Sequence, residues 1–228
     1  MKYVLFAAIC LMTVACSSKK ITDRKLEERE HEEIKRDYSV VDASSPKRSG
    51  WLEDAEIYAS QNNMEVDKFR YFAFETEPKV SRTIACDLAK AQVRADIAAE
   101  IATFIDKQLT VAKEGDSSID ENNPSVKALK EFTESKLTEK VLSMVHGAEV
   151  FQTYWEKRKY QQSLGAKKDF TAYTCAVFVR MDSKRLAEAV DEAASLVERE
   201  AKGDAKALVK KALNNASDDF IKEQTARD

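Results

Sequence analysis

Few side chains in this sequence of 228 residues are suited to acid–base or nucleophilic chemistry. Its two histidines are His31, inside a run of charged residues, and His146, which precedes Gly147 at an expected helix end. Catalysis of the Ser-His-Asp type needs a histidine beside an activated nucleophile, and neither histidine is flanked by such a motif. No Gly-x-Ser-x-Gly, phosphate-binding glycine loop or Cys-x-x-Cys occurs. We therefore expect no enzyme, with no catalytic residue and no metal ligand.

The cysteines are the other reactive side chains, and Cys10 and Cys16 both belong to the first segment of the chain. One positive charge, Lys2, precedes an apolar run of about a dozen residues, which is the size of a secretory signal peptide. A helix that crosses a bilayer needs roughly 20 apolar residues, so this run is too short to be one. We expect residues 1–15 to be a signal peptide and the chain to be exported.

Residues Thr13-Val14-Ala15-Cys16 resemble the lipobox of bacterial lipoproteins. The resemblance implies that Cys16 becomes the first residue of the mature chain and carries a covalent diacylglyceryl group and an N-acyl chain such as palmitate. Two or three acyl chains hold a protein firmly in a membrane. In such lipoproteins an Asp directly after the lipidated cysteine opposes sorting to the outer membrane. Ser17 occupies that position here, so the resemblance implies sorting to the outer membrane. We expect a protein anchored by lipid on the periplasmic face of the outer membrane, with no other cofactor.

Cys86 and Cys175 remain once Cys10 is removed and Cys16 is acylated. An exported chain meets an oxidising compartment, so these two cysteines could form a disulfide. The alternative is that each is a separate small buried side chain, because both lie within apolar patterns. The sequence favours this second interpretation.

Aromatic and basic residues are interleaved in the segment FQTYWEKRKY, residues 151–160. The candidate partner-binding residues are Tyr154, Trp155, Lys157, Arg158 and Tyr160, which could contact a glycan or a partner protein. The alternative is that Trp155 packs in the core while the cations protect an edge strand from pairing with other chains. With 37 basic and 40 acidic residues, the whole chain offers no electrostatic basis for binding nucleic acid.

Apolar spacing predicts the elements that hold these residues. We expect helices in 51–61, 82–113, 123–147 and 183–213, and strands in 68–76, 148–162 and 169–181. Ser81, Asn123 and Asp182 are the expected N-caps, and Gly203 is a weak point in the last helix. The last two strands form a hairpin around Gly165. The pattern predicts an α+β fold with a three-stranded, largely antiparallel sheet, two central helices and a long C-terminal helix.

The segments differ enough in composition to predict domain boundaries. Residues 16–50 contain KLEEREHEEIKRDY and SSPKRSG, which are typical of a charged tether and a loop. A folded domain is expected over 51–190, followed by a C-terminal helical extension over 191–228.

The segments LAKAQVRADIAAEIATFI, GAEVFQTYWEKRKY and FTAYTCAVFVRMD resemble the LPP20-like family of outer-membrane lipoproteins over about residues 80–190. The family has an Ala- and Arg-rich helix followed by strands with similar motifs. The resemblance implies a small anchored domain without known catalysis, and some members form basal disks or rings around flagellar motors.

Two functions follow as hypotheses. The first is a non-catalytic outer-membrane lipoprotein that acts as a structural or assembly component in the periplasm, for example a ring or disk subunit of an envelope machine such as the flagellar motor. The alternative is a module that binds peptidoglycan or another glycan. A three-stranded sheet has two open edges, and helix 183–213 is long enough to reach an adjacent copy. We therefore expect a homo-oligomer or contacts with other envelope proteins.

Overall fold

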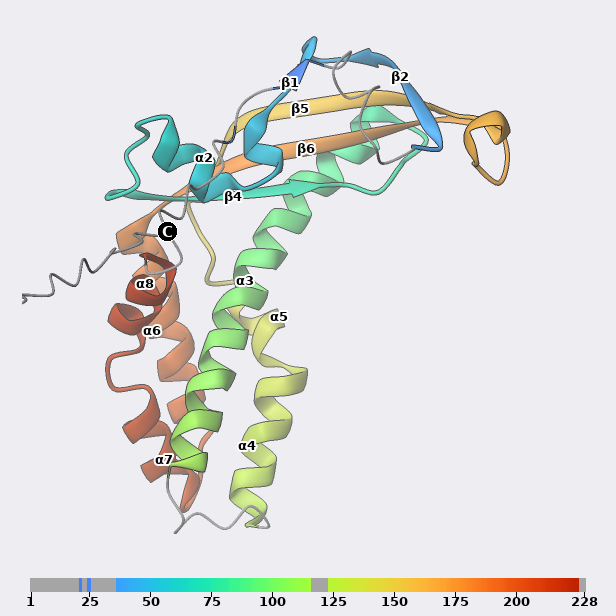
Figure 1. The fold of residues 1–228 in the computed structure, drawn as a ribbon. Helices are drawn as coiled ribbons and strands as arrows, with labels where there is room; N and C mark the ends of the chain where they lie inside the picture. The colour runs from blue at the N-terminus through green and yellow to red at the C-terminus, as the bar shows by residue number, and fades with distance from the viewer. Residues whose placement is uncertain (1–20, 22–23, 26–35, 116–122, 226–228) are drawn as a thin grey trace, which may run out of the picture.

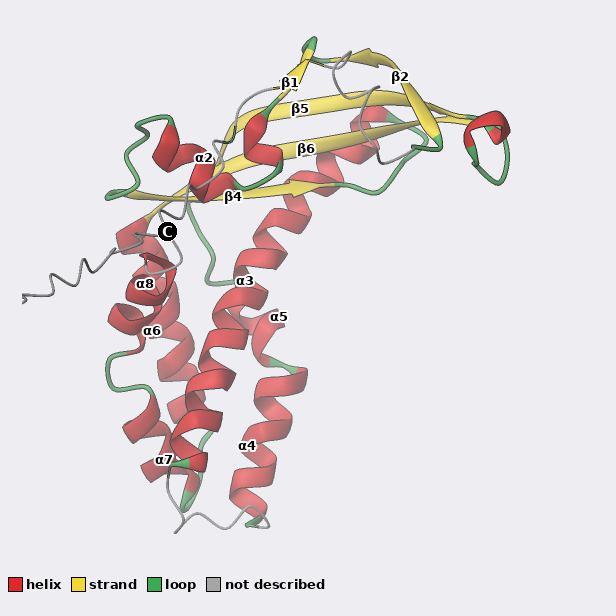
Figure 2. Ribbon diagram, viewed as in Figure 1, coloured by secondary structure: helices red, strands yellow, loops and turns green. Residues whose placement is uncertain are grey.

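The computed structural model of the chain describes residues 21, 24–25, 36–115 and 123–225. A β-sheet lies across one end of a stem of helices (Figure 1), and Figure 2 shows the strands and helices in separate colours. The predicted α+β class is confirmed. The expected signal peptide, the lipidation site Cys16 and His31 lie outside the described residues.

The main sheet has four strands in the order β2-β5-β6-β4, and all neighbours are antiparallel. Their bounds are β2 (Tyr38–Ala43), β4 (Phe69–Glu75), β5 (Glu149–Tyr160) and β6 (Phe170–Asp182). The predicted hairpin is β5–β6, which pairs from Glu149↔Arg180 to Tyr160↔Phe170 with one bulge between Val150 and Gln152. The sheet thus contains the three predicted strands and one more.

The additional strand β2 comes from the segment that the sequence predicted to be a tether. It pairs with β5 from Tyr38↔Tyr160 to Ala43↔Glu156. Two-residue strands β1 (Arg24–Lys25) and β3 (Lys47–Arg48) form a separate small ladder. The folded domain therefore begins well before residue 51, and β5 lies inside the sheet, where it is not the edge strand that we expected.

The long helix α3 (Arg82–Glu114) connects the sheet to the stem. In its first part, Ala89 and Val93 pack against Val177 and Val179 of β6. Its second part runs down the stem, where its buried side chains join the main core; they include Ile97, Ile101, Phe104, Ile105 and Leu109. This helix matches the predicted span.

The helix predicted over 123–147 is divided into α4 (Pro124–Ser135) and α5 (Leu137–Leu142). Asn123 caps α4 as expected, because its side chain accepts a hydrogen bond from the Ser125 amide. Lys136, with φ −125°, interrupts the helix between the two parts. The chain leaves α5 at residue 142 and reaches β5 through an extended connection.

The C-terminal segment folds back on its own stem. Asp182 caps α6 (Ser183–Glu200) by accepting from the Lys184 and Arg185 amides. Gly203 then takes a positive φ of 51°, a conformation that glycine adopts without strain, and the chain returns as α7 (Ala205–Ala212) and α8 (Ala216–Thr225). Phe220 of α8 packs against Phe104 with ring centroids 5.0 Å apart. These residues share one core with α3, so they belong to the domain, and the extension expected to reach an adjacent copy is used within the chain.

The sheet has two covered faces. The helix face is the one that packs against α3. The N-terminal face is covered by residues 44–66, which include η1 (Gly50–Leu52) and α2 (Ala55–Gln61) in place of the single helix predicted there. Trp51 stacks on Phe178 with centroids 5.3 Å apart, and Tyr71 stacks on the same ring at 5.4 Å. This aromatic cluster fastens η1 to the sheet.

Candidate functional site

The five candidate binding residues of β5 lie on two different faces. Side chains alternate along a strand, so Tyr154, Arg158 and Tyr160 point to the N-terminal face and are buried. Trp155 and Lys157 point to the helix face and are partly exposed. The five side chains therefore do not form one continuous surface.

On the helix face, the start of α3 covers part of the β5 aromatic side chain. The Arg82 guanidinium lies 4.9 Å from the centroid of the Trp155 ring. Lys157 lies over the ring of Tyr173, with its Nζ 5.8 Å from the centroid. Cations placed in this way are attracted by the negative ring face. These contacts contribute to packing within the chain. The edge of β5, which the cations of segment 151–160 were expected to guard, is occupied by β2.

On the N-terminal face, four charged side chains form the ion cluster: Arg48, Glu75, Glu156 and Arg158. Arg158 Nε donates to Glu156 Oε2 at 2.7 Å, and Arg158 Nη2 donates to Glu75 Oε1 at 2.5 Å. Arg48 Nη2 donates to Glu75 Oε2 at 2.6 Å, and Arg48 Nη1 lies 3.4 Å from Glu156 Oε1. The Glu156 side chain is 0% exposed and also accepts from the Tyr154 hydroxyl at 3.0 Å. Each cation thus contacts both carboxylates.

The charges of the cluster stabilise one another. Burial alone would raise the pKa of Glu75, but the hydrogen bond from Arg48 and the charges of Arg48 and Arg158 outweigh it, so the pKa is lowered. Burial opposes the charged form of both arginines, yet the two carboxylates raise the pKa of Arg48 and of Arg158. These shifts keep Arg48, Glu75 and Arg158 charged, which suits a structural ion cluster; an acid–base catalyst would need a group that changes its protonation state near neutral pH.

The ion cluster fastens the segment that precedes residue 51 to the sheet. Arg48 reaches the two carboxylates from β3, and the Arg158 guanidinium lies 4.6 Å from the centroid of the Tyr38 ring in β2. Glu75 comes from β4, on the opposite side of β6. The cluster therefore joins β4 and β5 of the main sheet to β3 of the N-terminal segment in one place.

Cys86 in α3 and Cys175 in β6 form a disulfide. They are joined, and are not the two separate buried side chains that the sequence favoured. The crosslink ties the first turn and a half of α3 to the centre of the sheet. It spans 89 residues of sequence.

An exposed apolar surface lies at the beginning of α3. Val80, Ile84 and Leu88 follow one another at four-residue spacing, and their side chains are 85%, 52% and 40% exposed. In this part of α3 the buried residues are Ala85 and Ala89. Because alanine side chains are small, the helix can approach the sheet closely on the side that carries Ala85 and Ala89. We call Val80, Ile84 and Leu88 the α3 patch.

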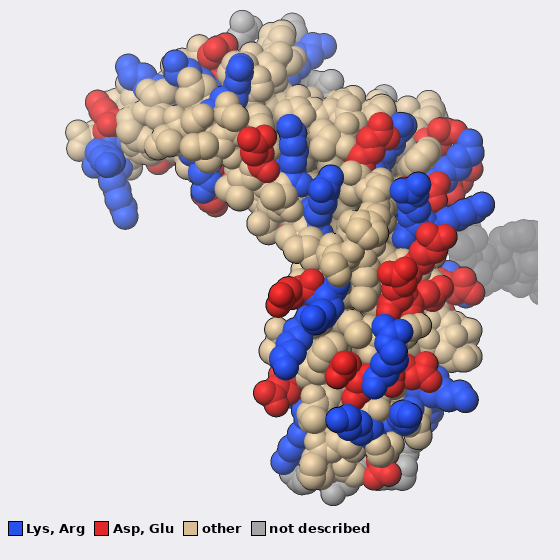
Figure 3. Space-filling view, turned by 180° about the vertical axis from the view of Figure 1, so that it is seen from behind, with Lys and Arg blue, Asp and Glu red and all other residues tan. Residues whose placement is uncertain are grey.

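The remaining surface is strongly charged. Figure 3 shows both signs interspersed over the sheet and the stem on the reverse side of the molecule. His146 is exposed in the connection between α5 and β5. Within the described parts of the chain, no three His, Cys, Asp or Glu side chains lie close enough together to hold a metal ion. No helix among these residues is both long and apolar enough to cross a membrane.

Comparison with known proteins identified no relative of this chain. No protein-family model, no curated protein and no solved structure matches this chain.

Proposed function

We propose that this protein is an exported, non-catalytic lipoprotein, anchored by a lipidated Cys16 to the periplasmic face of the outer membrane, where it is a structural component of an envelope assembly. The lipobox resemblance of residues 13–16 supports the anchor. The resemblance of residues 80–190 to LPP20-like lipoproteins supports a subunit of a ring or disk.

The α3 patch is the observation that carries the assembly part of the proposal. Val80, Ile84 and Leu88 are exposed apolar residues near the start of α3, on a molecule whose surface also carries many charged side chains. Contiguous exposed apolar surface is typical of sites that contact other proteins. A second copy of the chain or another envelope protein would remove these side chains from water.

The disulfide supports export. Disulfides form and persist in oxidising compartments such as the periplasm, whereas the cytoplasm keeps most cysteines reduced. A crosslink between α3 and the sheet core therefore agrees with a protein that folds after export.

Two experiments test the two parts of the proposal. For the anchor, the wild-type chain and Cys16→Ala are expressed in a Gram-negative cell and fractionated. We expect wild type in the outer membrane and Cys16→Ala in the soluble periplasmic fraction with its disulfide formed. Cys16→Ala protein that stays with the outer membrane after a salt wash would refute lipid anchoring.

For assembly, light scattering measures the mass of the full-length lipoprotein in detergent at tens of micromolar. We expect a mass above that of one chain. If wild type is a monomer and also captures no envelope protein by crosslinking in cells, the structural role is wrong.

A further inference from the structure

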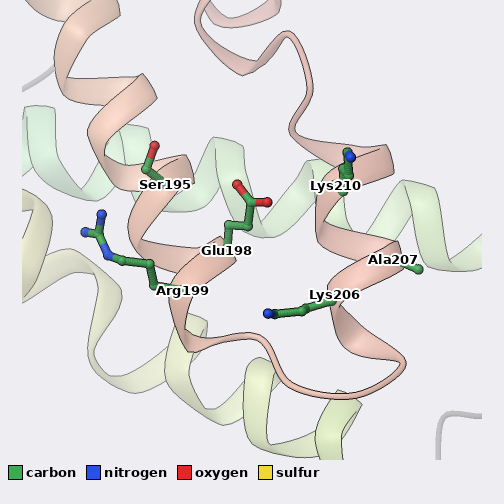
Figure 4. A pocket seen from close by; sticks show the side chains of 6 residues that line it. All are labelled: Ser195, Glu198, Arg199, Lys206, Ala207 and Lys210. Atoms are coloured by element: carbon green, nitrogen blue, oxygen red, sulfur yellow. The ribbon is translucent and has the colours of Figure 1, made fainter.

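A cleft in the stem carries charges that the fold does not use. It lies between α6 and α7, has a volume of about 590 Å³, and is lined by Ser195, Glu198, Arg199, Lys206, Ala207 and Lys210. In Figure 4 the Glu198 carboxylate and the Lys206 side chain extend toward the space between the two helices, whereas the Arg199 side chain extends from the other side of α6. A volume of this size is ordinary for a small-ligand site.

The reversal at Gly203 brings the two walls of the cleft together. Ser195 and Arg199 are four residues apart on α6, and Lys206 and Lys210 are four residues apart on α7. Such a spacing places two side chains on one face of a helix, about 6 Å apart along its axis. The α7 wall therefore offers cations at two levels.

The cations of the cleft are not neutralised within the chain. In the parts that the structure describes, no carboxylate lies within 4.0 Å of the Arg199, Lys206 or Lys210 cation, while Lys90, Lys130 and Lys222 on other helices pair with Asp87, Glu134 and Asp219. Between the two helices, Lys206 and Lys210 outnumber the single carboxylate of Glu198, on a chain whose net charge is −3. The cleft thus favours an anionic ligand.

The position of Glu198 restricts which anions could bind in the cleft. A compact dianion such as phosphate would meet the Glu198 carboxylate as well as the cations. A ligand with separated carboxylates and one ammonium group would satisfy Lys206 and Lys210 of α7 and Glu198 of α6 together. Short acidic peptides that contain a diamino acid have this charge pattern.

We propose that the α6–α7 cleft binds an acidic peptide with an excess of carboxylates and one free amine, which is the charge pattern of the peptidoglycan stem peptide. The choice of this peptide rests on the proposed periplasmic location. Carboxylates of the peptide contact Lys206 and Lys210, and its amine contacts Glu198. The protein then has a lipid anchor at one end and a contact to the cell wall on its stem.

The test measures binding of the probe N-acetyl-L-alanyl-γ-D-glutamyl-meso-diaminopimelate to the full-length protein in detergent by titration calorimetry. We compare wild type with the double variant Lys206→Ala/Lys210→Ala. The expected result is a Kd about tenfold weaker or more in the double variant, because two charged contacts are lost. The matched control, Lys140→Ala/Lys184→Ala, removes two exposed lysines outside the cleft, and its Kd should stay within about twofold of wild type.

A second variant tests the role of Glu198. Wild type should prefer the probe with a free diaminopimelate amine over the same probe with that amine acetylated. Glu198→Gln should bind both forms equally, while circular dichroism shows an unchanged fold.

Three results would overturn the proposal: no binding of the probe to wild type, equal affinities in wild type and the cleft variant, or inorganic phosphate binding as tightly as the peptide. The last would make the cleft a general anion site. Because the titration uses purified protein, it can fail while the fractionation of Cys16→Ala succeeds, and the reverse also holds.

Discussion

The two faces of the sheet are held to their covering layers by different kinds of interaction. On the helix face, Ala89 and Val93 of α3 pack against branched side chains of β6, and one disulfide crosslinks the layers. On the N-terminal face, the aromatic cluster around Phe178 is joined by the ion cluster, which holds β3 and strand β2 beside it. One layer is held by apolar burial and a covalent bond, the other partly by charges.

This difference indicates which face of the sheet should lose stability when the pH falls. Apolar burial and a disulfide do not respond to mild acid, whereas a buried charge cluster is stable only while all its members are charged. The charged face is also the one that carries the segment nearest to the expected anchor. Variants on the two faces should therefore lose stability by different amounts and with a different dependence on pH.

The largest loss of stability is expected for Glu156→Ala. This change leaves the buried Arg158 and the partly buried Arg48 with one carboxylate, and breaking a buried ion pair in this way costs about 3–5 kcal/mol. Urea denaturation followed by circular dichroism measures the loss. The control is Glu149→Ala, which breaks the pair with Arg180 where the carboxylate side chain is 61% exposed, and should cost less than about 1 kcal/mol. Similar losses in both variants would refute a special role for the cluster.

Removal of the disulfide should have the next largest effect. A crosslink over 89 residues restricts the unfolded chain strongly, so Cys86→Ala/Cys175→Ala should lower the free energy of unfolding by about 2–4 kcal/mol. Adding a reductant should destabilise wild type and leave the double variant unchanged. If reductant has no effect on wild type, the disulfide does not contribute to the stability of the helix face.

Acidification should weaken the N-terminal face selectively. Because the pKa of Glu75 is lowered by folding, its contribution is complete above the unfolded pKa of about 4.3 and is lost as the pH falls through the lower folded value. Urea midpoints measured between about pH 6 and pH 3 should fall less steeply in Glu75→Gln than in wild type. The cysteine double variant should keep the wild-type slope. Parallel slopes in wild type and Glu75→Gln would show that Glu75 is not the group responsible.

The smallest effect on stability is expected at the α3 patch. Leu88 is 40% exposed, so Leu88→Glu should change the free energy of unfolding by about 0.5 kcal/mol or less. It should nevertheless reduce the mass of the assembly in light scattering, because the proposed contact is apolar. Val111→Glu, at a 56% exposed position farther along α3, is the matched control and should leave the mass unchanged. Dissociation by both variants or by neither would argue against this patch as the contact.

Much of the fold was predictable from short-range signals. The caps Asn123 and Asp182 and the apolar spacing located α4 and α6, and β-branched residues around Gly165 located the β5–β6 hairpin. Strand β2 was missed because its six residues follow a long charged run, and their partner β5 lies more than 100 residues away. Only tertiary pairing reveals such a strand.

The candidate site was harder to predict for the same reason. Alternation along β5 does indicate that Tyr154, Glu156 and Arg158 share a face, so a buried acidic residue could have been found from the pattern. Nothing local indicates that Arg48 and Glu75 meet them. The cysteine pairing likewise depends on how α3 crosses β6, which the sequence alone does not show.

The strand order has a consequence for how the chain folds. Tyr38 pairs with Tyr160, Phe69 pairs with Asp182, and Arg70 donates to the Ile221 carbonyl at 3.2 Å across 151 residues of sequence. In the main sheet β2 pairs with β5 and β4 pairs with β6, so both N-terminal strands need partners from the later part of the chain, and β4 also contacts α8. Folds dominated by such distant contacts form slowly. The helix α3 and the hairpin can form early from neighbouring residues, so strands β2 and β4 are the parts of the domain that must wait for the rest of the chain.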